Sequence, residues 1–470
     1  MTTVLAPRLV VAGTTSGVGK TTVATGLMAA FRRRGVRVAA AKVGPDFIDP
    51  GYHALATGRP GRNLDAWICG PAAIPALAGR AGRGGELLIV EGVMGLFDGA
   101  ADDGVTATGT TSTAGVARLL DAPVVLVVDA SSMSRSVAAL VYGFATFDPH
   151  LHLAGVVLNR VGSDGHEMML REALSPLGIP VLGVLRRDPA WAWRDRHLGL
   201  VPVAEHPDEV ARSLDALAAT IDSSCDLGAI ERLAATAPRR EVADPQRQTA
   251  PAGGNRVRVA VAAGPAFTFA YRDNLEALEA AGAELIAVDP MNDAALPEGC
   301  AGLYAGGGFP EVFAEALAGN RPLLDDVAAR CRHGLVTWAE CGGLLWLARS
   351  LDGHALAGVV PTQGRMTDRL TLGYRRATAL ADNPVLVAGD EVRGHEFHYS
   401  ALDPPGDAVE LASRFGRGRA GFAGPSLFAS YLHLHLGADP APAGRFVDAA
   451  RVYAGGFRVT QAGASPARRS

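Results

Sequence analysis

The chain has 470 residues and a net charge of −4, with 48% apolar and 20% charged residues. This length predicts two or three domains, each large enough for its own core, and the composition is ordinary for a soluble globular protein. The slight acidity argues against nucleic acid as the main partner, because phosphate backbones require a basic surface. No apolar run reaches the roughly 18 residues of a membrane span. The N-terminus also lacks the basic start of an export signal.

The cysteines are odd in number and have no metal-binding spacing: Cys69, Cys225, Cys300, Cys331 and Cys341. Reduced thiols in a cytoplasmic protein are therefore expected.

A glycine-rich turn at residues 13–22 separates an apolar run, 9–12, from a helix-forming run that begins at Val23. This order is the context that a phosphate-binding loop requires, because backbone amides then surround phosphate oxygens at the start of a helix. Lys20 would reach the terminal phosphates and the Thr21 hydroxyl would bind magnesium. The alternative is a plain turn with a surface lysine. We predict an ATP site that comprises Ser16, Gly17, Gly19, Lys20, Thr21 and Thr22.

The first half of the chain reads as an α/β domain with a parallel sheet. Apolar runs alternate with helical patterns, at 8–13, 36–43, 86–92, 123–130, 153–161 and 180–185. Continuous apolar runs are typical of strands buried on both faces of a parallel sheet. In such sheets ligands bind beyond the carboxyl ends of the strands, so polar residues at those ends are the candidates for function.

Three strand ends carry such residues. Asp46 follows the second run and is placed to hold magnesium or its waters, or else it is a turn aspartate. Glu91 ends the third run and is the stronger metal candidate, unless it is a helix-capping carboxylate. Asp98 is a weaker second candidate. Asn159 ends the run at 153–161, where its amide would read an adenine edge or form a turn.

Two arginines and a linker complete the first half. Arg59 and Arg62 have the forked shape that binds carboxylates, although each alone is typical of solvated surface. Residues 237–256 are rich in Pro, Gly, Gln and charge, and indicate an exposed connector. A second α/β series begins at Val257, and the last residues, 455–470, are small, polar and basic, which indicates disorder.

The second half contains a candidate nucleophile. Cys341 lies between an apolar strand and a helical run, followed by two glycines that permit a sharp turn. Proximity to a helix N-terminus favours the reactive thiolate. The alternative is an inert buried cysteine.

A thiol nucleophile also requires a base and an oxyanion site. Residues 430–436 alternate strictly, so that His433 and His435 share one face. A second source of a base is the run 394–399, in which Glu396 and His398 share one face. Free amides in the three-glycine loop at 306–308, together with the Gly342 amide, would bind an oxyanion, unless the loop is a plain turn.

The phosphate-binding loop has one residue more than the standard spacing and resembles that of dethiobiotin synthetase. From Leu9 to about Leu436 the chain resembles the cobyrinic acid and hydrogenobyrinic acid a,c-diamide synthases. The motifs that carry this resemblance are 13–22, 42–46, 62–65, 91–99, 196–200, 306–311, 341–343, 394–399 and 431–433.

The resemblance implies an α/β protein of two domains. One is a P-loop NTPase-like domain with a parallel sheet, and the other is a flavodoxin-like glutamine amidotransferase domain. The implied boundaries are 1–222 for the ATP domain, 223–256 for the linker, 257–454 for the amidotransferase domain and 455–470 for the tail.

The resemblance also implies roles for individual residues. Thr21, Asp46 and Glu91 fall on magnesium positions, Asn159 on the adenine contact, Cys341 on the nucleophile and His433 on its base. Class I amidotransferases usually have a glutamate two residues after this histidine, but here His435 occupies that position. The group that orients His433 is therefore open.

The implied reaction is the amidation of the a and c acetates of a corrinoid polycarboxylate, with ATP, magnesium and L-glutamine, in cobalamin biosynthesis. Neither a nucleic acid nor a membrane is an expected partner, and a homodimer is one reading of the oligomeric state. The alternatives are a related ligase, such as cobyric acid synthase or a nickel-sirohydrochlorin diamide synthase, and an ATP-driven switch with no biosynthetic role. Cobalt-containing and metal-free substrates are both open.

Overall fold

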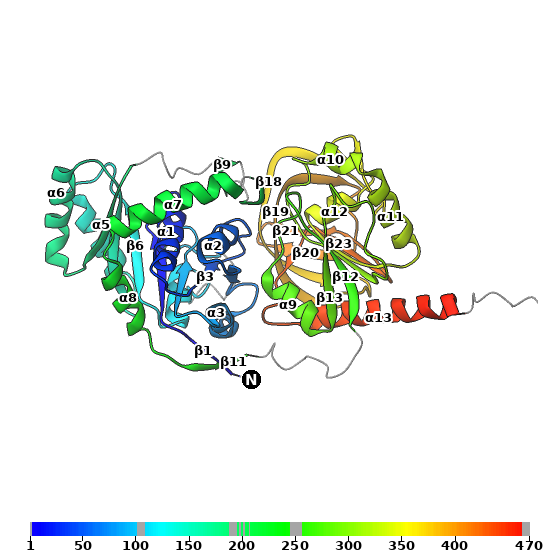
Figure 1. The fold of residues 1–470 in the computed structure, drawn as a ribbon, viewed down its shortest axis with the longest axis horizontal. Coiled ribbons are helices and arrows are strands. Elements are labelled where there is room, and N and C mark those ends of the chain that lie inside the picture. The colour runs from blue at the N-terminus through cyan, green and yellow to red at the C-terminus, as the bar shows by residue number, and fades with distance from the viewer. Residues whose placement is uncertain are drawn as a thin grey trace, which may run out of the picture. The chain divides into compact units, whose positions relative to one another are not determined.

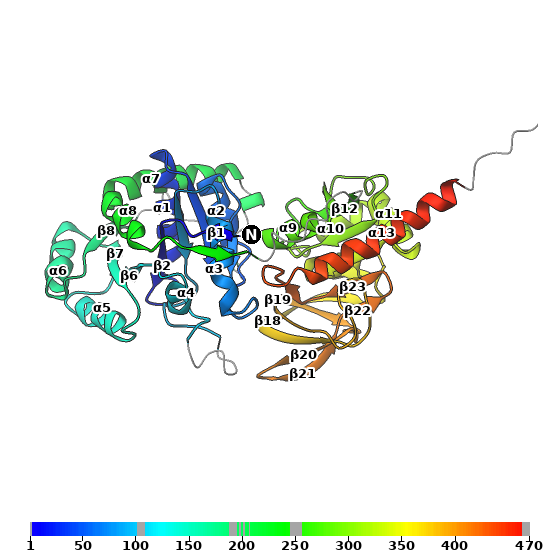
Figure 2. The same cartoon turned by 90° about the horizontal axis from the view of Figure 1, so that it is seen from below.

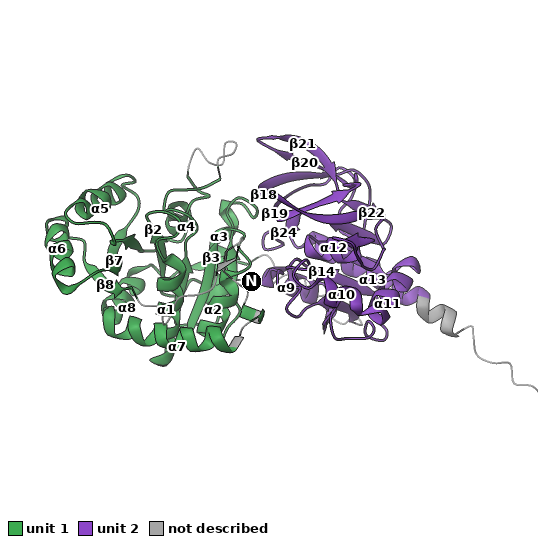
Figure 3. Ribbon diagram, turned by 90° about the horizontal axis from the view of Figure 1, so that it is seen from above, with its two compact units in different colours: residues 1–245 green, residues 246–470 purple. Residues whose placement is uncertain are grey.

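The structure of the protein is a computed structural model. It describes residues 2–100, 109–187, 195–196, 199–200, 203–205, 207–244 and 256–462. The chain divides into two compact units, residues 1–245 and 246–470, each described here by itself (Figure 3). Among the described residues, no helix is both long and apolar enough to cross a membrane.

The core of unit 1 is a parallel sheet of seven strands (Figures 1 and 2). In pairing order these are β4 (Arg62–Leu64), β3 (Val38–Val43), β5 (Leu87–Glu91), β2 (Arg8–Gly13), β6 (Val124–Asp129), β7 (Leu153–Val161) and β8 (Val181–Arg186). The six predicted runs are confirmed as strands, and of the seven strands of this sheet β4 is the one that was not predicted. The chain builds the sheet on one side of β2 and then crosses to the other, so the end of β2 lies at the position where ligands bind in such sheets.

Helices cover both faces of this sheet. One face carries α3 (Ile74–Gly82), α4 (Thr113–Leu119), α5 (Ser136–Thr146) and α6 (Asp164–Leu174), and the other α1 (Lys20–Arg33), α2 (Asp49–Thr57), α7 (Pro207–Ser224) and α8 (Leu227–Thr236). Alternate residues of β2 enter the two cores: Val10 packs into one, and Leu9 and Val11 into the other. Short elements complete the unit: β1 (Thr2–Val4), η1 (Pro71–Ala73), η3 (Ser175–Leu177), β9 (Asp195–Arg196), β10 (Gly199–Leu200), η5 (Val203–Glu205) and β11 (Glu241–Ala243).

The predicted linker, 223–256, is partly folded. Its first part is α8, whose Leu227, Ile230 and Ala234 are buried in the core beside α1. Its next part is β11, which pairs with β1 in antiparallel register. The sequence did not predict α8 because its three buried residues form only a narrow apolar face. The rest of the helix has the composition of a polar connector. Residues 245–255 of the predicted linker lie outside the described residues.

Unit 2 is built on a second parallel sheet, which one antiparallel strand extends. In pairing order its strands are β13 (Ala283–Val288), β12 (Val257–Ala262), β14 (Gly302–Ala305), β15 (Val336–Glu340), β23 (Leu427–Ser430) and β22 (Phe422–Gly424). The five parallel strands have the chain order 2-1-3-4-5, which is the flavodoxin-like order. The predicted fold class is therefore confirmed for this unit.

A second, mainly antiparallel sheet lies in the same unit. Its strands are β16 (Ser350–Leu351), β17 (His354–Ala355), β18 (Gln363–Ala379), β19 (Glu391–Asp403), β20 (Val409–Ser413), β21 (Gly416–Ala420) and β24 (His433–Leu434). The helices of unit 2 are α9 (Arg272–Ala280), α10 (Ala314–Gly319), α11 (Arg321–Arg332), α12 (Gly342–Leu347) and α13 (Ala441–Ala462).

The predicted disordered tail, 455–470, begins as helix. Helix α13 continues to Ala462, while residues 463–470 lie outside the described residues. Phe446 and Val447 of α13 are buried against the unit 2 sheet. Once this packing has formed the first turns, each further residue adds a backbone hydrogen bond, so the helix extends beyond its buried part.

We predict that Gly343→Ala destabilises unit 2. A Cβ at this position would lie 2.1 Å from the carbonyl oxygen of Ala305, which belongs to the backbone and cannot move aside. Overpacking of this kind typically costs about 1–3 kcal/mol. The measurement is urea unfolding, with Gly444→Ala in α13 as control, because a Cβ there meets nothing within 4 Å. Equal stabilities of the two variants would contradict the prediction.

Candidate active sites

The first candidate site is the turn that follows β2. Gly17 and Gly19 have φ angles of 77° and 94°, which side chains rarely tolerate, so the turn requires glycine at both positions. Lys20 is buried, and its ammonium donates to the Thr15 carbonyl at 3.0 Å. Ser16 is exposed at the tip of the turn. The turn, Lys20 and the start of α1 thus form the cradle expected for phosphate groups.

Below this turn, a buried cluster surrounds Glu91, the last residue of β5. Thr21 Oγ1 donates to Glu91 Oε1 at 2.6 Å, and Lys42 Nζ lies 2.8 Å from the same oxygen. His53 Nε2 lies 2.6 Å from Glu91 Oε2. Burial by itself favours the neutral acid, but Lys42 and His53 outweigh it and hold the pKa of Glu91 below its ordinary range. The carboxylate is therefore charged and paired.

Asp49, the first residue of α2, belongs to this cluster, and sequence reasoning missed it. Its Oδ2 lies 2.6 Å from Lys42 Nζ and 3.5 Å from Thr21 Oγ1. Asp46 has a different role, because its Oδ1 accepts the amides of Ile48 and Asp49 at 2.7 and 3.0 Å. Asp46 thus makes the turn contacts of its alternative reading, and a magnesium contact for it stays a prediction. The sequence indicated Asp49 only in that it is the second acidic residue of this loop, three positions after Asp46.

The side chains of this cluster fit the magnesium ion that the P-loop implies. Thr21, Asp49 and Glu91 supply the hard oxygen atoms that this ion prefers. Throughout the described part of the chain, no three His, Cys, Asp or Glu side chains are grouped as metal ligands. Two carboxylates and a hydroxyl are nevertheless a usual protein contribution, since magnesium commonly takes its other ligands from water and phosphate.

The two lysines of this site differ in their proton affinity. Burial and the nearby Lys42 ammonium lower the pKa of Lys20 to about 8. Burial also opposes the charge on Lys42, but Asp49 and Glu91 outweigh it and raise the pKa of Lys42. Lys42 is therefore a permanent cation that neutralises the acids. Lys20 is the cation whose charge an incoming phosphate would stabilise.

Asn159, in β7, is buried behind the turn. Its Nδ2 donates to the Val18 carbonyl at 2.8 Å, and its Oδ1 accepts the Arg160 amide at 2.9 Å. Arg160 has a positive φ of 60°, donates to the Gly17 carbonyl at 2.9 Å and pairs with Asp129. Both residues hold the turn in place. An adenine contact for Asn159 stays a prediction.

Other predicted residues of unit 1 have structural partners. Asp98 accepts the Gly95 amide at 2.8 Å. Arg62 lies buried in β4 rather than on a solvated surface, and Arg59 donates to the Arg83 carbonyl. Their role in attracting a polycarboxylate stays a prediction.

The second candidate site surrounds Cys341, between β15 and α12. Its φ and ψ angles are 48° and −101°, a strained conformation for a residue with a side chain. The predicted sharp turn is thus confirmed. Such strain costs on the order of 1–3 kcal/mol and occurs mainly where function requires it. The Sγ atom is 4.0 Å from the Phe397 carbonyl of β19.

Strand pairing brings Cys341 and His433 to the same region of unit 2. Strands β15 and β23 are parallel neighbours with Glu340 opposite Ser430, and the Cys341 amide donates to the Ser430 carbonyl at 2.8 Å. His433 follows Ser430 by three residues. A Cβ on Gly307 would lie 2.6 Å from His433 Cε1 and 3.3 Å from its Nε2, so this edge of the ring faces the glycine loop.

The other histidines have different surroundings. His395 lies opposite His433 in the sheet and stacks on it with 4.9 Å between ring centres. Burial and the neighbouring His433 hold the pKa of His395 well below its ordinary value, so it is neutral. His398 stacks on Tyr431 at 3.7 Å, and its Nδ1 is 2.8 Å from the Ser400 carbonyl. Of these rings, His433 is the one whose edge meets the glycine loop.

The glycine loop offers fewer amides than predicted. The Gly307 amide donates to the Phe269 carbonyl at 2.9 Å and is therefore committed. The nitrogen of Gly308 lies 2.9 Å from the position that a Cβ on Gly342 would take. The amides of Gly308 and Gly342 are thus the candidate oxyanion donors.

The thiol of Cys341 is not activated at rest. Burial and then the Glu311 carboxylate raise its pKa above the ordinary range, which contradicts the predicted preference for thiolate. The helix that was expected to stabilise the thiolate is α12, which has only six residues. The positive end of this helix does not offset the cost of burying a charged sulfur. The sulfur therefore requires a base to react.

Comparisons with known proteins identify the family. The family described as "CobQ/CobB/MinD/ParA nucleotide binding domain" matches residues 9–200, and that described as "CobB/CobQ-like glutamine amidotransferase domain" matches residues 258–441. A hydrogenobyrinate a,c-diamide synthase from Streptomyces coelicolor is 49% identical over 95% of this chain and 98% of its own. A cobyrinate a,c-diamide synthase from a Synechococcus strain is 42% identical over 92% and 96%. The chain belongs to the a,c-diamide synthase family.

The two matched ranges of this chain fall in different units. The nucleotide-binding range lies in unit 1 and the amidotransferase range in unit 2, so each candidate site has a matched domain of its own. The resemblance inferred from the motifs is confirmed. Of those motifs, residues 197 and 198 lie outside the described residues.

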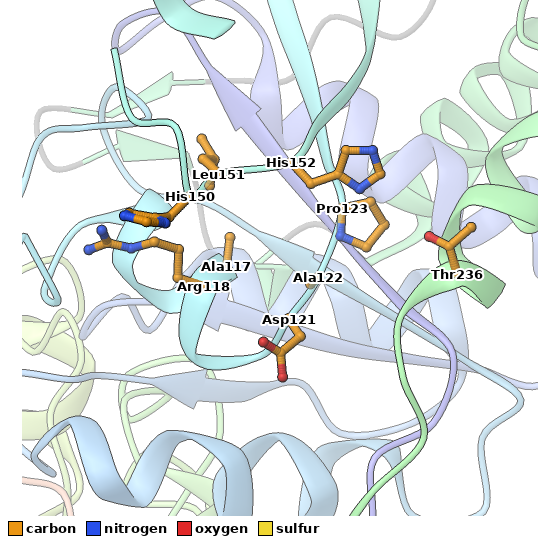
Figure 4. Close-up of a pocket in the computed structure, with 9 residues that line it drawn as sticks. All are labelled: Ala117, Arg118, Asp121, Ala122, Pro123, His150, Leu151, His152 and Thr236. Carbon is orange, nitrogen blue, oxygen red and sulfur yellow. The ribbon is translucent and has the colours of Figure 1, made fainter. Parts of the chain in front are cut away.

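A surface pocket of about 390 Å³ lies elsewhere on unit 1 (Figure 4). Its lining includes Arg118, Asp121, Pro123, His150 and His152. Pro123 precedes β6 and His152 precedes β7, so the pocket is at the amino ends of the strands. The phosphate-binding turn is at the opposite, carboxyl ends, and the pocket is therefore separate from it.

We predict that Asp49, rather than Asp46, supports magnesium in nucleotide binding. Calorimetry would measure ATP affinity with and without the ion for Asp49→Asn and Asp46→Asn. Asp49→Asn should lose most of the magnesium-dependent gain in affinity, about tenfold or more, because one charge-bearing oxygen ligand is gone. Asp46→Asn should keep that gain. A selective loss in Asp46→Asn would contradict the assignment.

We predict slow alkylation of Cys341 in the free enzyme. Because its pKa is raised, the rate with iodoacetamide should keep rising with pH through pH 9 without a plateau, as read from peptide mass spectrometry. A glutamine analogue with a diazoketone warhead should label the same sulfur at neutral pH, since binding brings the substrate to the base. Fast alkylation by iodoacetamide with a midpoint below pH 7 would show a resting thiolate instead.

Proposed function

We propose that the protein amidates the a and c acetate carboxylates of cobyrinic or hydrogenobyrinic acid, with ATP and with ammonia taken from glutamine, in cobalamin biosynthesis. One observation carries the proposal: a single chain contains two sites. Unit 1 has a phosphate cradle, and unit 2 has a cysteine with a strained backbone at the end of β15 and a histidine beyond the end of the neighbouring strand β23. Membership of the a,c-diamide synthase family supports the same reaction.

Unit 1 would energise the acid. A carboxylate does not react with ammonia in water because its oxygen is a poor leaving group. Phosphoryl transfer from ATP converts it to an acyl phosphate, and Lys20 with the turn amides would bind the transferred group. Magnesium, held by Thr21, Asp49 and Glu91, would neutralise phosphate charge. Lys42 holds the two acids in place when they are not engaged.

Unit 2 would release ammonia. His433 takes the proton from the Cys341 thiol as the sulfur attacks the amide carbon of glutamine, and gives it to the departing nitrogen. The Gly308 and Gly342 amides would stabilise the oxyanion. Water then hydrolyses the thioester to glutamate. Ammonia displaces phosphate from the acyl phosphate in unit 1, and each round consumes one ATP and one glutamine.

The substrate class follows from the relatives rather than from a contact in the structure. The relatives include both hydrogenobyrinate and cobyrinate a,c-diamide synthases, and the more similar of the two cited here is named for the metal-free acid. We therefore propose hydrogenobyrinate as the first substrate to test. All five cysteines are free thiols, which supports a cytoplasmic location.

The decisive assay supplies purified protein with ATP, magnesium and glutamine, and with each macrocycle in turn. Mass spectrometry should record two successive exchanges of a hydroxyl for an amino group on the substrate. The alternative of an ATP-driven switch predicts ATP hydrolysis without any change in the macrocycle, and that outcome would refute the proposal.

We predict that Cys341→Ser loses glutamine-dependent amidation but keeps the activity with ammonium salts. The substitution removes the nucleophile of unit 2 and leaves the phosphate cradle of unit 1 unchanged. The expected loss with glutamine is at least about 10³-fold, as when a covalent nucleophile is removed. Cys331→Ser is a matched control, since that thiol lies on α11 and contacts the Thr337 hydroxyl at 3.4 Å. Loss of the ammonium reaction in a folded Cys341→Ser protein would contradict the division of labour.

A further inference from the structure

Glu340, the last residue of β15, is buried directly before the nucleophile. It is 1% exposed, although it carries an ionisable group. Its two oxygens have fixed partners: the Leu434 amide donates to Oε1 at 3.2 Å, and the Tyr304 hydroxyl donates to Oε2 at 3.2 Å. Burying a carboxylate is costly unless it is paired. The question is which group of the site this carboxylate serves.

The geometry points to His433. Its Nδ1 lies 3.6 Å from Glu340 Oε2, and both side chains are 1% exposed. The other edge of the same ring, at Cε1 and Nε2, faces Gly307 in the glycine loop. Glu340 therefore approaches the imidazole from behind, and Nε2 is directed to the side where the oxyanion donors lie. This is the arrangement of a base that a carboxylate holds in one tautomer.

His435 occupies the position where class I amidotransferases usually have a glutamate, and an imidazole cannot supply the carboxylate. Its Nδ1 accepts the Gly437 amide at 3.0 Å, and its ring packs on Tyr271 with 4.4 Å between centres. His395 is the other ring beside His433, but it stacks face to face with 22° between planes. Among the described residues around His433, the carboxylate that lies nearest its Nδ1 is that of Glu340.

We propose that Glu340 is the positioning residue that orients His433, and that it replaces the acid expected two residues after the histidine. In this arrangement the acid that orients the base comes from β15, directly before the nucleophile, and not from the segment that follows His433. Glu340 would accept a hydrogen bond from the Nδ1–H group and leave the Nε2 lone pair free to take the proton of the Cys341 thiol. It would then stabilise the imidazolium that this proton transfer forms. The proposal rests on the glutamine hydrolysis assigned to unit 2.

The test measures glutamine hydrolysis by wild type and Glu340→Gln across pH. We expect kcat to fall at least about 10²-fold, because an amide neither fixes the tautomer nor stabilises the imidazolium. We also expect the acidic limb of kcat/KM to move to lower pH, since a nearby carboxylate favours protonated His433. His395 stacks on this ring, Tyr271 contacts His395 and His435, and Tyr304 contacts Glu340; all four are unchanged in the variant.

Two variants separate positioning from a structural role. Tyr304→Phe removes the hydroxyl that donates to Glu340 but keeps the carboxylate, so the acidic limb should stay in place. Glu340→Asp keeps the charge at a greater distance, so kcat should fall about tenfold without the shift in the limb. If Glu340→Gln does not fold, Glu340→Asp decides the matter, and a wild-type rate in that variant would overturn the proposal.

The amidation driven by ammonium salts is the internal control, because it needs unit 1 alone and should match wild type in every variant. Glu340→Gln with wild-type hydrolysis, or with a lower rate but an unmoved acidic limb, would overturn the role of Glu340. If the wild type itself does not hydrolyse glutamine, the function proposed for unit 2 fails, and that outcome is distinct from an unaffected variant.

Discussion

Both candidate sites depend on one property of parallel sheets, namely that neighbouring strands end at the same edge. In unit 1, β2 leads into the phosphate-binding turn while its neighbour β5 ends at Glu91, so a hydroxyl on α1 meets a carboxylate 70 residues away. In unit 2, β15 ends at the nucleophile and its neighbour β23 leads to His433. The same arrangement thus gives phosphate chemistry in one unit and thiol chemistry in the other.

The second shared feature is the burial of charge. Lys42 lies between Asp49 and Glu91, and in the other unit Glu340 lies between a tyrosine hydroxyl, a backbone amide and an imidazole. Burying any of these groups without a partner would be costly, and each of them has partners that offset this cost. In each case the pairing leaves a side chain poised at the edge of the site: Thr21 in unit 1 and His433 in unit 2. Burial here serves orientation rather than stability.

The division into two units matches the division of the chemistry. Each unit has its own pair of hydrophobic cores on the two faces of its own sheet, and each contains one matched domain and one candidate site. Acyl phosphate formation needs a cradle for anions, while amide cleavage needs a thiol and a base. These requirements conflict within a single site, because a phosphate cradle is rich in cations and the surroundings of Cys341 include the Glu311 carboxylate.

The sequence by itself determined the local features: the strand runs of unit 1, the glycine turn around Lys20, and the sharp turn at Cys341. These depend on residues next to one another, whose conformational preferences act over a few bonds. Only the tertiary structure decided that Asp49 and not Asp46 reaches Thr21, that burial keeps the Cys341 thiol protonated, and that Glu340 stands behind His433. Those outcomes depend on side-chain direction and desolvation, which arise only when strands distant in sequence pair and exclude water from between them.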